Sequence, residues 1–146
     1  LNYIQRKLVD INYYIYGSTK YLEKYGIPKT INDLNKHRFI SFGKGAPSPV
    51  FNPDWALKLG VKDNKKRKSI MKVNSVMGLL LAVESGVGLA ALPEYLVSSS
   101  TNVIKVLPNS AGPITEAHFV YPQSLKNVAR VQAFRNFLYS KIGDWK

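Results

Sequence analysis

Few side chains of this sequence have the types and spacing that catalysis requires. His37 and His118 are its two histidines, and neither lies in the nucleophile-elbow motif that presents a catalytic serine to its base. The sequence has no cysteine, its nine Asp and Glu residues are dispersed, and it carries neither a Walker loop nor a dinucleotide-binding glycine motif. We therefore expect a protein that binds and does not catalyse, with no catalytic residue, no metal and no cofactor.

A short turn at residues 74–76 offers backbone groups for binding. A strand is expected at Ser69–Val73, and the helix that follows, over about 75–85, has apolar residues at helical spacing: Val76, Leu79, Leu80 and Val83. Asn74 or Ser75 can cap this helix, and Gly86 ends it. N–H groups in the first turn of a helix lack intrahelical partners and attract anions. The turn is therefore either an anion site or an ordinary helix cap, and the sequence leaves both open.

The charge of the chain is strongly positive. Its 21 Lys and Arg residues against nine Asp and Glu residues give a formal net charge of +12. Most of the lysines are scattered, as a compositional bias would produce, and the charge is concentrated only between Lys62 and Lys72, where Asp63 is the sole acid: Lys62, Lys65, Lys66, Arg67, Lys68 and Lys72. This segment is either a solvated loop or a contact for nucleic acid.

Strands and helices are expected to alternate around these residues. Besides 69–73, strands are expected at 9–16, 39–42, 88–92, 103–107 and 116–121, and also around Trp55, Leu57 and Leu59. Short helices are expected from a Ser18 cap to Gly26, behind a capping box of Thr30 and Asp33, and from Pro93 to about 98, with a longer one over about 128–142. Gly43 to Pro53 is expected to be a loop. This order predicts an α/β fold with a mainly parallel sheet.

The length and composition suit one ordinary domain. The longest apolar run, Val76–Val83, is far shorter than the roughly 20 residues of a membrane-spanning helix. Residues 1–16 lack the pattern of a signal peptide, and without cysteine the chain needs no oxidising compartment. We expect a cytoplasmic protein with no membrane contact, and a chain that begins inside a longer one.

Four segments, in order along nearly the whole chain, resemble one family. Residues 21–38 are similar to a "YL…G.P…..DL..H" pattern, and they are followed by similar segments at 73–78 and 82–96 and at 119–122 before the last helix. Together they resemble the effector-binding domain of LysR-type bacterial transcription regulators. That resemblance implies a fold similar to type II periplasmic binding proteins, in which a small-molecule effector is held between two lobes.

The resemblance also implies how the chain is divided. Residues 1–16 would be a remnant of the first lobe with a crossover strand, 17–115 one complete second lobe, and 116–146 the returning strand and C-terminal helix of the first lobe. The rest of the first lobe, together with the helix-turn-helix that contacts DNA in the full-length regulator, would lie N-terminal to this chain. The chain would then be truncated at its N-terminal side.

Site residues follow from the same resemblance. It places the 74–76 turn at the cleft, so Asn74, Ser75 and Val76 are expected to contact the effector, and Ser41, Phe42 and Tyr121, which lies on the returning strand, are further candidates. A homo-oligomer is expected, with a dimer interface formed by Leu89, Leu92, Tyr95 and Leu96. Two alternatives are a solute-binding protein of a transport system and a direct nucleic-acid binder that uses residues 62–72.

Overall fold

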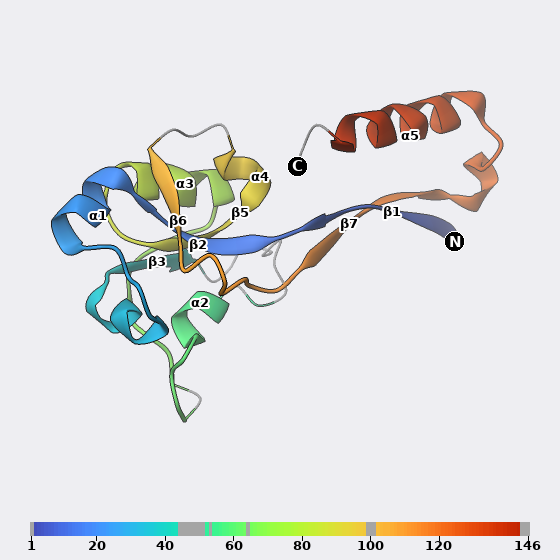
Figure 1. The fold of residues 1–146 in the computed structure, drawn as a ribbon. Helices are drawn as coiled ribbons and strands as arrows, with labels where there is room; N and C mark the ends of the chain where they lie inside the picture. The colour runs from blue at the N-terminus through green and yellow to red at the C-terminus, as the bar shows by residue number, and fades with distance from the viewer. Residues whose placement is uncertain (1, 44–51, 53, 64, 99–101, 144–146) are drawn as a thin grey trace. The chain divides into compact units, whose positions relative to one another are not determined.

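The chain forms two compact units. The computed structural model describes residues 2–43, 52, 54–63, 65–98 and 102–143. Unit 1 combines Leu1–Ile11 with Ile114–Lys146, and unit 2 comprises Asn12–Pro113 (Figure 1). Unit 1 contains β1 (Tyr3–Ile11), β7 (Thr115–Pro122), η2 (Gln123–Leu125) and α5 (Ala129–Ile142). Unit 2 contains β2 (Tyr13–Ser18), α1 (Thr19–Tyr25), η1 (Ile31–Lys36), β3 (Phe39–Phe42), α2 (Trp55–Lys58), β4 (Ser69–Val73), α3 (Val76–Glu84), β5 (Ala90–Pro93), α4 (Glu94–Val97) and β6 (Val103–Val106).

The strands of unit 2 form two groups that are linked by backbone hydrogen bonds. β2 lies between β5 and β6 and pairs antiparallel with both, whereas β3 and β4 pair in parallel. Leu89, directly before β5, donates to the Arg38 oxygen and accepts from the Ile40 N–H, both at 2.8 Å, in an isolated parallel bridge. The strands therefore follow one another in the order β4, β3, β5, β2, β6.

The expectation is a mainly parallel mixed sheet, and β2 is the strand of unit 2 that runs against the others. β3 to β6 all run in one direction, but β2 runs opposite to them and makes both of its ladders antiparallel. A strand–helix–strand order such as β5–α4–β6 fixes the relative direction of the two strands that it joins. That order does not predict which strand lies between the two. In this sheet β2 lies between β5 and β6.

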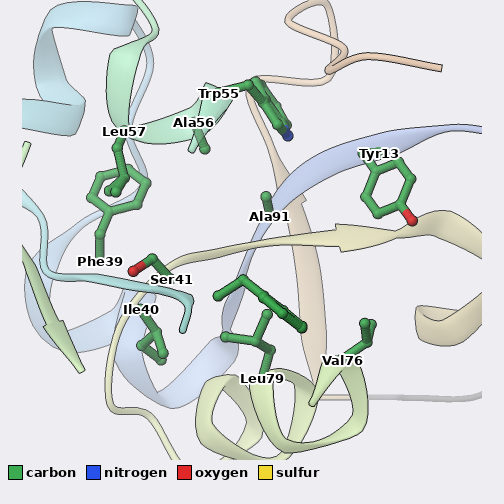
Figure 2. Close-up of a pocket in the computed structure, with 11 residues that line it drawn as sticks. Tyr13, Phe39, Ile40, Ser41, Trp55, Ala56, Leu57, Val76, Leu79 and Ala91 are labelled. Atoms are coloured by element: carbon green, nitrogen blue, oxygen red, sulfur yellow. The ribbon is translucent and has the colours of Figure 1, made fainter. Parts of the chain in front are cut away.

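Apolar side chains of α3 and the sheet form the core of unit 2. α3 packs against β2, β3 and β5, and it buries Leu79, Leu80 and Val83. They belong to a cluster of buried residues that also includes Tyr16, Ile40, Ala90, Leu92, Val97 and Val103. α2 lies on the other side of the strands from α3, as Figures 1 and 2 both show. The sheet is therefore covered on two sides near the carboxyl end of β3.

Several helix ends form as the sequence predicts. The Ser18 hydroxyl accepts from the Tyr21 N–H at 3.3 Å and caps α1, which ends at Gly26 with φ +84°. Thr30 and Asp33 form the expected capping box at the start of η1. Each of these motifs involves residues within a few positions of one another, so local hydrogen bonding is sufficient to form them.

The strand expected around Trp55 is wrong, because residues 55–58 form the short helix α2. The apolar alternation of Trp55, Leu57 and Leu59 suggested a strand, yet Ala56 is also buried, so three successive side chains point into the protein. The Leu59 N–H donates to the Trp55 oxygen at 2.9 Å, which is a helical bond. Most of the loop expected at 43–53 lies outside the described residues.

Unit 1 is built on the antiparallel pair of β1 and β7. The register shifts between Lys7 and Val9, where β1 carries a bulge. α5 contacts β1 through the Tyr139 hydroxyl, which donates to the Lys7 oxygen at 2.9 Å. The boundaries between the two units fall between residues 11 and 12 and between residues 113 and 114. Residues 13–16 therefore belong to unit 2, where they form most of β2. Within the described ranges, no helix is both long and apolar enough to span a bilayer.

Candidate functional site

The first turn of α3 has two backbone donors without a partner among the described residues. Ser75 is extended (φ −138°, ψ 132°), and its hydroxyl accepts from the Gly78 N–H at 3.2 Å. The Leu79 N–H donates to the Ser75 oxygen at 3.0 Å as the helix begins. The N–H groups of Val76 and Met77 have no hydrogen-bond partner in the described part of the chain. The Ser75 side chain is thus a helix cap, and the free donors are the next two backbone groups.

A small pocket lies beside this turn. Its volume is about 30 Å³, which is roughly the share of one water molecule in the liquid. α2 and the sheet form one side, and Val76 and Leu79 of α3 face it from the other side (Figure 2). Most lining side chains are apolar: Phe39, Ile40, Phe42, Ala56, Leu57, Val76, Leu79 and Ala91. Tyr13, Ser41 and Trp55 add polar atoms to the lining.

The structure brings together three of the six predicted effector residues. Ser41, Phe42 and Val76 all line the pocket. Ser41 is buried, and its hydroxyl donates to the Ser69 hydroxyl at 2.9 Å. Because the Gly43 N–H donates to the Val73 oxygen at 2.9 Å, the end of β3 lies directly beside the turn that precedes α3.

The other three candidates do not line this pocket. Asn74 and Ser75 are exposed and do not line the pocket. Tyr121 lies in unit 1, where it is buried, and the centroid of its ring is 5.2 Å from the ring centroid of Phe119. Its predicted place at the effector site stays a prediction.

Sequence reasoning missed the contribution of α2 and β2. Trp55, Ala56 and Leu57 of α2 and Tyr13 of β2 line the pocket. The Trp55 indole nitrogen is buried without a hydrogen-bond partner, and no other buried side-chain nitrogen or oxygen of the described residues shares that state. The signal available in the sequence was the apolar run after Asp54, but only an α-helical interpretation of it would have placed these side chains together.

Burial corrects part of the predicted dimer interface. Leu89 and Leu92 are both 0% exposed, so their side chains pack inside unit 2 and cannot contact a partner. Tyr95 is 48% exposed, and Leu96 packs partly against the core. Of the four interface candidates, these two remain. An apolar strand fits both a core and an interface, and here the sheet and α3 enclose it.

Neither histidine is placed for catalysis at this pocket. The His37 ring nitrogen Nδ1 is 3.3 Å from the Tyr21 hydroxyl, which accepts from the Arg38 N–H at 2.9 Å. Burial lowers the pKa of His37. His118 lies on β7 in unit 1, 3.5 Å from Glu116. No group of three metal-binding side chains occurs among the residues that the structure covers.

Unit 2 is thus an α/β unit with a covered mixed sheet and a small pocket beside the start of α3. A family model described as the LysR substrate binding domain matches residues 2–142. The chain therefore belongs to this family, the effector-binding domains of LysR-type transcription regulators. The family is non-enzymatic, and its fold is similar to that of periplasmic binding proteins.

Individual relatives agree with this assignment. Over 123 residues, or 82% of this chain, the sequence is 29% identical to an uncharacterized HTH-type transcriptional regulator of Haemophilus influenzae, and the match covers 41% of that protein. The regulatory domain of CrgA, a LysR-type regulator of Neisseria meningitidis, matches 96% of this chain at 22% identity and a TM-score of 0.78, with 69% of that domain covered. The effector domain of AmpR of Pseudomonas aeruginosa matches 97% at 16% identity and a TM-score of 0.65, with 66% covered. The chain thus spans less than half of the regulator from Haemophilus.

Proposed function

We propose that this domain senses a small anionic molecule at the start of α3, beside the end of β3. The observation that supports this most is the pair of free N–H groups at Val76 and Met77 next to a pocket lined by Ser41 and Phe42. α3 has nine residues, so its dipole adds about 0.3–1 kcal/mol for a negative group at its N-terminus. A carboxylate would accept the two N–H groups, and an apolar tail, which is larger than the pocket, would lie against the partly exposed Phe42 and Val76.

In this proposal unit 2 is the second lobe of the effector domain, and unit 1 carries parts of the first. The effector would bind between lobes, with Tyr121 of β7 near the hinge, and would bias the relative disposition of the lobes. In the full-length cytoplasmic regulator, that bias would reach the DNA-binding helix-turn-helix through a dimer that uses Tyr95 and Leu96. The family assignment favours this function over transport of a solute.

A matched pair of small molecules tests the ligand class. Isovalerate has a carboxylate and a branched apolar tail, and isovaleramide has the same shape without the charge. We expect isovalerate, titrated into the 146-residue chain, to shift the amide NMR signals of Val76, Met77 and Phe42, and we expect isovaleramide to shift them far less. Equal responses to both compounds, or isovalerate responses that leave Val76 and Met77 unmoved, would contradict the proposal.

A further inference from the structure

A second and larger pocket borders the edge strand β4. Its volume is about 260 Å³, room for about eight water molecules or one small metabolite. It shares Ser41, Phe42 and Leu57 with the first pocket, and its other lining residues come from the segment before α2 and from the basic segment that leads into β4: Asp54, Lys66, Arg67, Lys68, Ser69 and Lys72. Of the nine residues that line this pocket, four are cationic and one, Asp54, is anionic.

Only one of the four cations is neutralised by a carboxylate. Lys66 forms an ion pair with Asp54, Nζ to Oδ2, at 2.5 Å. The charges that remain on Arg67, Lys68 and Lys72 have no acidic partner in the described part of the chain. Among the residues that the structure describes, three positive charges of the pocket wall are therefore uncompensated.

Arg67 is fixed in place by neutral acceptors. Its guanidinium donates to the Asn35 side-chain oxygen at 2.8 Å and to the Leu59 backbone oxygen at 2.7 Å. Burial lowers the pKa of Arg67, but an arginine stays charged at neutral pH. Dipoles hold this cation without cancelling its charge, so it contributes a fixed positive potential to the pocket.

The Ser41–Ser69 pair adds a hydrogen-bond donor. The buried Ser41 hydroxyl donates to the Ser69 hydroxyl at 2.9 Å, which uses one acceptor site of Ser69. A hydroxyl has one hydrogen of its own, and that of Ser69 has no acceptor within the described ranges. Ser69 also lines the pocket, so its hydrogen can point at a ligand there.

We propose that this pocket is a second binding site, for a small oxyanion with two or more negative charges. Lys68 and Lys72 would supply mobile ammonium donors, Ser69 a hydroxyl donor and Arg67 the fixed charge. Phosphate esters and polycarboxylates share this chemistry. A concave pocket with a hydroxyl pair in its wall favours such a ligand over duplex DNA, which would use the whole basic segment.

Pyrophosphate and citrate, added to the 146-residue chain at matched ionic strength, test the proposal by calorimetry. We expect saturable binding of at least one, and which of the two binds distinguishes phosphate from carboxylate recognition. The double variant Lys68→Gln/Lys72→Gln should weaken binding on the order of tenfold or more, since it removes two charged hydrogen bonds. Ser69→Ala should weaken it several-fold.

The matched control is Lys62→Gln/Lys65→Gln, which removes the same charge from the same segment but from residues that do not line the pocket. Binding in this variant should be weakened much less than in Lys68→Gln/Lys72→Gln, because neither side chain lines the pocket and exposed charges outside it are screened by salt. Absence of saturable binding, or binding that survives Lys68→Gln/Lys72→Gln, would overturn the proposal. Equal weakening by both double variants would also overturn it and would indicate diffuse attraction, as for nucleic acid.

Discussion

Replacement of Ser75 separates the stability of α3 from ligand binding at its first turn. Ser75→Ala removes the hydroxyl that accepts from the Gly78 N–H at 3.2 Å. Loss of a serine cap costs about 1 kcal/mol of folding free energy, which for a chain of this size lowers the melting temperature by about 2–4 °C. The free N–H groups of Val76 and Met77 are unaffected, so the affinity for isovalerate should stay nearly the same.

Ser75→Asp should have the opposite effects. A carboxylate at the cap position still accepts from the Gly78 N–H, and its charge is favourable at a helix N-terminus, so stability should be unchanged or slightly higher. The same charge would repel a bound carboxylate. Two like charges 4 Å apart repel by about 1 kcal/mol in bulk water and about 4 kcal/mol at an effective dielectric constant near 20. The affinity for isovalerate should therefore fall at least about fivefold, and Ser75→Asn, which caps without charge, should restore it.

Thermal melting followed by circular dichroism and NMR titration with isovalerate measure the two effects separately. An unchanged melting temperature in Ser75→Ala would refute the capping role. Isovalerate binding in Ser75→Asp as tight as in the unmodified chain would show that the anion lies elsewhere.

Four other substitutions test the fold of unit 2. Gly88→Ala places a Cβ 2.6 Å from a backbone oxygen at the start of β3 and should destabilise the chain by about 1–3 kcal/mol, whereas at Gly43 the nearest atom is 3.7 Å away and Gly43→Ala should be nearly neutral in denaturant unfolding. The Thr30 hydroxyl is the main cause of the lowered pKa of Asp33, so Thr30→Val should raise that pKa towards 3.8 in an NMR titration. The stability that this carboxylate adds is present above pH 3.8 and is lost as the pH falls through the lowered pKa. In Thr30→Val the free energy of unfolding should therefore decrease less on acidification. Arg67→Lys replaces the guanidinium that donates to Asn35 and Leu59 and should lower the unfolding free energy by about 1–3 kcal/mol. A melting temperature equal to that of the unmodified chain would contradict the anchoring role of Arg67.

Local interactions made part of the fold predictable. Ser18, Thr30 and Ser75 cap helices because each hydroxyl accepts an N–H three residues later, and such bonds depend only on neighbouring residues. The antiparallel place of β2 depends on pairing with strands more than 70 residues away in the sequence, which no local pattern encodes. The sequence of α2 also fits a strand, because four residues are too few to distinguish the helical and strand periodicities.

The candidate site was predictable to a similar extent. The family resemblance alone names Ser41, Phe42 and Val76 as candidates for one site, and all three line one pocket. Trp55 reaches the same pocket only because α2 packs over the sheet, which depends on long-range contacts. Leu89 and Leu92 were assigned to a partner interface because an apolar segment does not reveal what covers it.

The position of bound isovalerate on the domain tests the central claim most directly. In the complex of the 146-residue chain with isovalerate, nuclear Overhauser effects from the ligand methyl groups identify the protons within a few ångströms. We expect contacts with Phe42 and Val76, and none with the side chains of Lys68 and Lys72. Contacts confined to Lys68 and Lys72, or to β1 and α5 of unit 1, would show that the start of α3 is not the effector site.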